Sequence, residues 1–124
     1  MPSKNPGQRL ADIPDNVDAI SSFCAELDLD AFRADRKTVY AVVRALEIIS
    51  EASRRLPEQL LERHPEIDWP AVAAAGNIYR HEYDAVDEAL ILYTVRHSLV
   101  ALRRVAEEEI MHVQSERPED VAGE

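Results

Sequence analysis

Apolar residues recur at intervals of three and four along most of the chain. Residues 35–57 read "DRKTVYAVVRALEIISEASRRLP", and the spacing of Val39, Val42 and Leu46 places them on one face of a helix. Asp35 stands where it can cap the start of that helix, and Pro57 stands where it would end it. Strand-like alternation is absent, and only 3 of the 124 residues are glycine. The pattern therefore predicts an all-α protein.

The same periodicity gives the expected elements. We expect a first helix within about 8–27, a second over 35–56, a short one over 57–64, a helical segment over 69–81 and a last helix over about 87–112. Because the connections are brief, these elements predict an up-and-down bundle of about four to five helices. We expect one domain spanning 1–124, with flexible ends at about 1–8 and 115–124. The expected core positions outside the second helix are Ile13, Val17, Ile20, Phe23, Cys24, Leu27, Leu92, Val95, Leu99, Leu102, Ala106, Ile110 and Val113.

Charge and cysteine content exclude several classes of protein. The formal net charge of -10 argues against a protein that coats nucleic acid by bulk attraction, although a local basic groove stays open. The single cysteine, Cys24, excludes an internal disulfide and a zinc site of several thiolates, so we expect it to fill the core. No secretory signal or apolar run of membrane-spanning length is present. We therefore expect a soluble cytoplasmic protein with no membrane partner.

Residues 76–83, "GNIYRHEY", crowd several reactive side chains near the end of a helix. Residues four apart share a helical face, so Gly76 and Arg80 form one column and Asn77 and His81 the next. A histidine can transfer protons near neutral pH, and an arginine can stabilise charge on phosphate oxygens. RNA carries its own nucleophile, the 2′-hydroxyl. The pair therefore suits RNA cleavage that requires no metal ion or other cofactor.

A structural interpretation competes with this one. Arg80 and His81 stand at the C-terminal end of a helix, where positive charge interacts favourably with the helix dipole. Residue chemistry alone favours such a solvated cap over a catalytic pair.

The order of residues in two longer stretches changes that balance. The segment "LEIISEAS" is followed by "RHPEIDWPAVA", which leads into an Asn, three spacers, His, one spacer, Tyr pattern. Asn77, His81 and Tyr83 occupy the pattern positions. The chain resembles the HepT-like branch of the HEPN family in these features, and the resemblance covers about residues 10–109.

The resemblance implies a HEPN-like homodimer and a function. Members of this branch are ribonuclease toxins of toxin-antitoxin pairs, in which arginine and histidine from both protomers line one RNA-cleaving cleft. A cognate minimal nucleotidyltransferase is the antitoxin and adenylylates the tyrosine of the motif. By resemblance, His81 is the catalytic histidine and Tyr83 is the modified tyrosine. We expect Arg80 to stabilise the phosphate and Asn77 to orient the reacting groups.

One position departs from the family pattern. The arginine of the motif usually stands immediately before the asparagine, and this chain has Gly76 there. One consequence is lost nuclease activity, which would leave a non-catalytic nucleotide- or substrate-binding subunit of the nucleotidyltransferase, or a dimeric scaffold. The other is that Arg80, one turn along the same face, supplies the charge, and the helical geometry modestly favours this.

Two features suit a homodimer or, equally, packing within one bundle. The stretch "AVAAAG", residues 71–76, would let another helix approach closely, and the last helix has a near-heptad apolar seam.

The remaining polar candidates have simpler interpretations. "EIMH", residues 109–112, has a spacing used in di-metal sites, but no second such motif occurs, so no metal site is predicted. We expect His64 at a helix end and His97 at the surface. Five charged residues of the second helix are expected to form surface ion pairs, while two of them, Arg44 and Arg54, are open to a role in a basic groove. The five are Arg44, Glu47, Glu51, Arg54 and Arg55.

Overall fold

The expected all-α bundle is confirmed. The computed structural model describes residues 6–81 and 88–115, and places side chains for residues 8–75 and 88–114. This part of the chain forms seven helices and contains no strand. They are α1 (Pro6–Cys24), α2 (Leu29–Ala34), α3 (Arg36–Arg54), α4 (Glu58–Glu62), α5 (Trp69–His81), α6 (Glu88–His97) and α7 (Leu99–Ser115).

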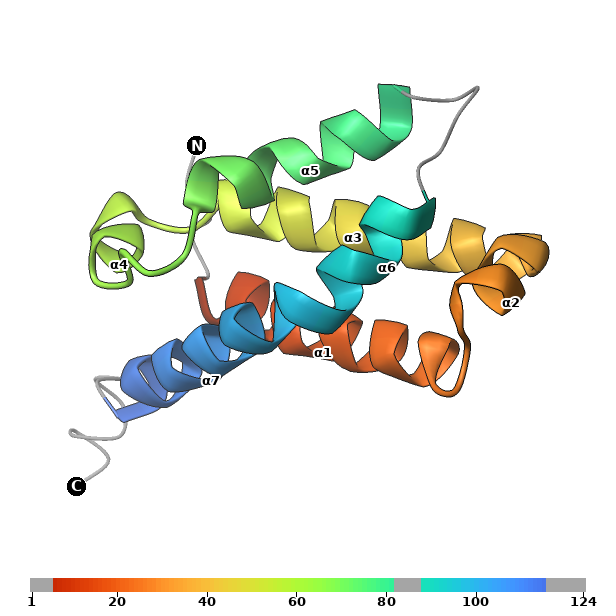
Figure 1. Ribbon diagram of the computed structural model, residues 1–124. Coiled ribbons are helices and arrows are strands. Elements are labelled where there is room, and N and C mark those ends of the chain that lie inside the picture. Colours follow the sequence, from red (N-terminus) through yellow and green to blue (C-terminus); the bar gives the residue numbers. More distant parts are fainter. Residues whose placement is uncertain (1–5, 82–87, 116–124) are drawn as a thin grey trace.

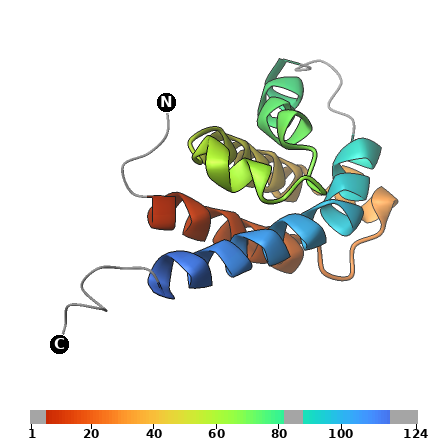
Figure 2. The ribbon, with the colours of Figure 1, turned by 90° about the vertical axis from the view of Figure 1, so that its left-hand side faces the viewer.

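The long helices are stacked in one order. α1 packs against α3 on one side and α7 on the other, and α5 covers the face of α3 opposite α1 (Figure 1). The same order is visible from the side (Figure 2). α6 contacts α2 and continues toward α7. α5 therefore forms an outer layer whose main support among the described helices is α3.

The core lies where α1, α3 and the last two helices meet. Ile13 and Ile20 of α1 are fully buried, as are Val42 of α3, Ile91 of α6 and Val105 of α7. Cys24 is also buried, as expected, and burial raises the pKa of its thiol. The expected apolar faces are thus the ones that pack together.

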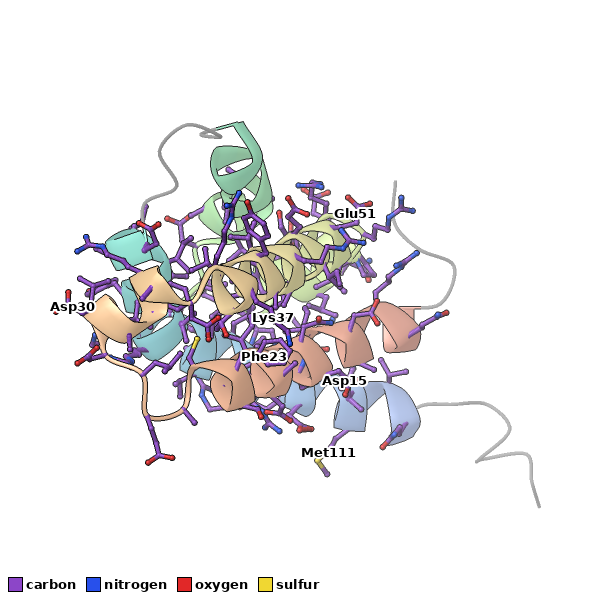
Figure 3. The ribbon with its side chains drawn as sticks, turned by 90° about the vertical axis from the view of Figure 1, so that its right-hand side faces the viewer. Asp15, Phe23, Asp30, Lys37, Glu51 and Met111 are labelled. Atoms are coloured by element: carbon purple, nitrogen blue, oxygen red, sulfur yellow. The ribbon has the colours of Figure 1, made fainter. Side chains whose placement is uncertain are left out.

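Phe23 is an exception to the expected core. Its side chain is 43% exposed, while Ile20 and Cys24 on either side of it are buried. Ile20 and Cys24 are four residues apart and share the inner face of α1, so Phe23 lies at the edge of that face. In Figure 3 it lies on the outer surface of the molecule.

The start of α3 follows the capping prediction. The Asp35 carboxylate accepts hydrogen bonds from the Thr38 backbone N–H at 3.1 Å and the Thr38 hydroxyl at 2.7 Å. Both bonds lower the pKa of Asp35, and the bond from the hydroxyl has the larger effect. The preceding short helix α2 was not expected from the sequence. It is capped by Asp28 and held by the fully buried Phe32.

The last helix differs from the expectation of one continuous element over 87–112. The chain forms α6 and α7, which are separated at Ser98. The Ser98 N–H still donates to the Thr94 carbonyl at 2.9 Å, so the interruption is small. Apolar periodicity runs unchanged from Val95 through Leu99 to Leu102, all of them buried, which is why the sequence carried no sign of a break.

None of the helices in the described part of the chain is long and apolar enough to cross a membrane.

Candidate active site

α5 carries the predicted site, and its first turn is held by an aromatic anchor. Trp69 is largely buried, and its indole N–H donates to the backbone carbonyls of Leu61 and His64, at 3.1 Å each. The Asp68 carboxylate accepts from the Ala71 N–H at 3.2 Å, which satisfies one free donor of the first turn. The "HPEIDWP" connection therefore fixes where α5 begins.

A partly buried polar cluster of Arg63, His64 and Glu109 ties this connection to α7. The Glu109 carboxylate lies 2.6 Å from Nη2 of Arg63 and 2.5 Å from Nε2 of His64. The Glu109 side chain is 5% exposed and that of His64 is 11% exposed, whereas Arg63 is 46% exposed. The hydrogen bond from Arg63, and then that from His64, lower the pKa of Glu109 despite burial. Glu109 is therefore held as a carboxylate.

This cluster was missed at the sequence level. Glu109 was considered there only as part of a rejected metal motif, and His64 only as a helix end. The available signal was its position, because Glu109 continues the seam of α7 seven residues after Leu102, where an apolar residue is expected. Among the described side chains, those of residues 8–75 and 88–114, no three His, Cys, Asp or Glu are grouped so that they could hold a metal ion.

A second polar contact joins α5 to α3 in the middle of the site helix. The Ser50 hydroxyl donates to the Ala73 carbonyl at 2.7 Å, and Nη1 of Arg54 donates to the same carbonyl at 2.6 Å. Nη1 of Arg54 also lies 3.1 Å from Ser50 Oγ. Both donors are on one face of α3, four residues apart. We call Ser50 and Arg54 the α5 clamp.

The expected surface ion pairs of α3 are present. Glu51 accepts from Nη2 of Arg54 at 2.5 Å and from Nε of Arg55 at 2.7 Å, and Arg44 lies 3.4 Å from Glu47. Hydrogen bonds from Arg55 and then Arg54 lower the pKa of Glu51. Figure 3 shows Glu51 on α3, to the side of α5. These contacts neutralise much of the positive charge that a basic groove would need.

An apolar groove separates α5 from the last two helices. It has a volume of about 280 Å³ and is lined by residues of α3, α5, α6 and α7, among them Leu46, Ala75, Leu90 and Leu102. Leu90 is 45% exposed at its rim. Among the described side chains, those lining the groove include no acid or base.

The predicted site residues fall in the last turns of α5 and just after it. Gly76, Asn77, Arg80 and His81 all belong to α5, which is helical as expected. Their side chains, and Tyr83 altogether, lie outside the described part of the structure. The roles assigned to these residues therefore stay predictions.

His97 lies at the surface, as expected. Its ring stacks on that of Tyr93, one turn earlier in α6, with ring centroids 4.3 Å apart. Tyr93 is itself 59% exposed. Nothing in this pair requires a catalytic role.

Comparison with known proteins identifies the family. A family model described as "Ribonuclease HepT-like" matches residues 13–109. The chain is 37% identical over 94 residues to "Probable ribonuclease HepT" of Thermococcus cleftensis, covering 76% of this chain and 86% of that protein. It is 34% identical over 91 residues to "Putative RNase MJ0127" of Methanocaldococcus jannaschii, covering 73% and 75% of the two chains.

A third relative, "Putative RNase MJ1380" of the same organism, is 31% identical over 98 residues, covering 79% of this chain and 90% of that protein. No solved structure gives a significant match. The family model spans α2 to α6 completely, the whole of α5 included. It leaves out only the start of α1 and the end of α7. The chain belongs to the HepT-like ribonuclease family.

Proposed function

We propose that this chain is a HepT-like toxin ribonuclease that cleaves RNA without a metal ion. The observation that carries the proposal is the family match over 13–109 together with a helical α5 that continues through His81. That continuity places Asn77 and His81 one helical turn apart, as the predicted chemistry requires.

The proposed reaction uses the substrate's own 2′-hydroxyl. His81 removes the proton from the 2′-oxygen, which attacks the adjacent phosphorus, and the bond to the 5′-oxygen breaks. The departing 5′-oxygen takes up a proton from water and His81 returns its proton to solvent, so the products are a cyclic phosphate and a 5′-hydroxyl. Arg80 stabilises the charge that develops on the phosphate oxygens, and Asn77 orients the phosphate.

We also propose that two copies share the cleft. The near-heptad seam of α7 does not support this, because Leu99, Leu102 and Ala106 are buried within the chain, where α7 packs on α1. The small-residue stretch does support it, since Ala74 is exposed on the outer layer formed by α5, and Ala71 is exposed where it lines the apolar groove. Their methyl groups would let a second helix approach closely, and the exposed Leu90 would extend the contact.

The test is RNA cleavage by purified protein, freed of any partner and assayed in EDTA. We expect wild type to cleave RNA and His81→Ala to be slower by about a hundredfold or more, because a general acid or base commonly contributes that much. His97→Ala is the matched control, since it removes an exposed histidine outside α5 and should retain activity. Light scattering on the same sample should report a dimer.

Two outcomes would contradict parts of the proposal. Cleavage that appears only when a divalent metal is added would show that metal independence is wrong. A monomer at micromolar concentration that still cleaves RNA would exclude the shared cleft.

Regulation is proposed to act through Tyr83. A cognate minimal nucleotidyltransferase, supplied with ATP, is expected to attach AMP to the Tyr83 hydroxyl, which adds negative charge that repels RNA. Peptide mass spectrometry should find AMP on wild type and none on Tyr83→Phe, and modified protein should lose RNA cleavage. AMP attached to another residue of wild type would refute the assignment.

A second candidate function rests on Gly76. Because the family arginine is missing there, the chain could instead serve as a non-catalytic nucleotide- or substrate-binding subunit of the nucleotidyltransferase. Wild type that binds the nucleotidyltransferase but cleaves no RNA, alone and unmodified, would select this function.

A further inference from the structure

The Ala73 carbonyl of α5 receives two side-chain donors from α3. Ser50 Oγ and Nη1 of Arg54 lie 2.7 Å and 2.6 Å from it. In a regular α-helix the carbonyl of residue 73 is the acceptor for the backbone N–H of residue 77. The α5 clamp therefore acts on the turn that leads directly into Asn77, and Arg80 and His81 follow one turn later.

Ser50 is one of two serines among the otherwise apolar buried residues of α3. It is 1% exposed, and a buried hydroxyl without a partner would cost stability. Ser53 is also buried in α3, but its hydroxyl finds a partner within the same helix, because it donates to the Ser50 carbonyl at 2.8 Å. Of these two buried serines, Ser50 is therefore the one whose hydroxyl reaches another helix.

Arg54 reaches α5 while its side chain stays 37% exposed. Nη1 bonds the Ala73 carbonyl and Ser50 Oγ, and Nη2 bonds the Glu51 carboxylate at 2.5 Å. Both terminal nitrogens are thus engaged, and Glu51 balances the charge. This geometry argues against the reading of Arg54 as a phosphate contact in a basic groove.

α5 needs such a fixed point because of its place in the fold. Figure 1 shows it crossing α3 at an angle and rising away from α3 toward its C-terminal end. Its inner side faces the apolar groove along Val72 and Ala75, and such apolar contacts are non-directional, so they specify rotation and register less sharply than a hydrogen bond does. A directional hydrogen bond at Ala73 fixes both.

We propose that Ser50 and Arg54 are positioning residues, which hold the last turns of α5 in the geometry that cleavage requires. The inference rests on the proposed function of α5 for its catalytic consequence, but its structural part is independent of catalysis. Because a displacement of about 1 Å at a reacting group can cost up to about a hundredfold in rate, the loss of the clamp should be visible in turnover.

The chain supplies matched controls for both residues. Ser50→Ala is compared with Ser53→Ala, which removes a buried hydroxyl bonded within α3. Arg54→Gln is compared with Arg55→Gln, which removes the neighbouring charge and a bond to the same Glu51 carboxylate. Circular dichroism checks that each variant keeps its helix content.

The first readout is amide hydrogen exchange measured by NMR. We expect Ser50→Ala and Arg54→Gln to speed exchange of the Asn77 amide and its α5 neighbours by about tenfold, as expected for one lost buried hydrogen bond. Amides of α1 and α7 should be unchanged, and both control variants should match wild type throughout. Unchanged exchange in α5 of the clamp variants would overturn the proposal.

The second readout is the kinetics of RNA cleavage. We expect kcat to fall by about tenfold to a hundredfold in the clamp variants with KM nearly unchanged, and Arg54→Lys to recover part of it by restoring a cationic donor. A rise in KM with kcat unchanged would instead identify Arg54 as a substrate contact and overturn the positioning role. If wild type cleaves no RNA while the exchange effect is present, the proposed function fails and the clamp stands.

Discussion

Glu109→Ala is expected to lower the free energy of unfolding by about 2 kcal/mol, because it removes the acceptor of a largely buried hydrogen bond to His64 and of the bonds from Arg63. The His64 ring, 11% exposed, would lose its acceptor at 2.5 Å, and the anchor between the "HPEIDWP" connection and α7 would open. Arg63 is 46% exposed, so its guanidinium stays hydrated in the variant and adds little to the loss. Urea unfolding followed by circular dichroism measures the change.

Glu108→Ala is the matched control for this substitution. Glu108 is the preceding residue of α7, is 52% exposed and pairs with Arg104 at 2.9 Å within the same helix. An exposed pair of this kind contributes about 0.5 kcal/mol or less. Equal losses in the two variants would show that the buried cluster adds nothing beyond a surface pair.

The same cluster should make stability depend on acid pH. The pKa of Glu109 is lowered in the fold, so its contribution is fully present above the usual glutamate value of 4.5 and is lost as pH falls through the folded value. Glu109→Gln should therefore show a shallower loss of stability than wild type on acidification below about pH 4.5. An identical slope in the two proteins would assign acid sensitivity to other carboxylates.

The fold followed from the sequence where local signals and burial agree. α3 shows this most clearly, because Asp35 caps its start and its apolar face is the buried one. α2 was missed because six residues are too few to show a helical period, and its stability depends on burying Phe32. The break at Ser98 was missed because the apolar spacing passes through it without change.

The polar contacts could be predicted only in part. Chemistry and spacing led to the "GNIYRHEY" stretch. The partners of Glu109, however, lie 45 and 46 residues away in the chain, and the partner of Ser50 lies 23 residues away. Such pairs depend on how helices stack, which periodicity does not specify. The usable signal was a polar residue at a position of the apolar stripe, because a buried polar atom needs a partner from somewhere.

Arg80→Ala is expected to slow RNA cleavage about a hundredfold or more, close to the effect of His81→Ala, if Arg80 has replaced the missing family arginine. The reason is that a positioned charge at the developing phosphate oxyanion commonly contributes that much to the rate. Single-turnover cleavage of one RNA by both variants makes the comparison. Arg104→Ala, at an exposed residue of α7, controls for loss of one positive charge.

Gly76→Arg, which restores the family's usual residue, gives a result whose sign distinguishes the two interpretations. If Arg80 already supplies the charge, a second guanidinium one turn away on the same helical face should repel it and lower the rate. If the site is merely degraded, the rate should rise toward that of a site with its arginine. Replacing glycine within a helix also stabilises that helix by up to about 1 kcal/mol, so Gly76→Ala is needed as a control. A higher rate in Gly76→Arg is assigned to the guanidinium only if Gly76→Ala does not raise the melting temperature and the rate together. Cleavage by Gly76→Arg but not by wild type would exclude a relocated arginine and leave the binding subunit as the function of the natural chain.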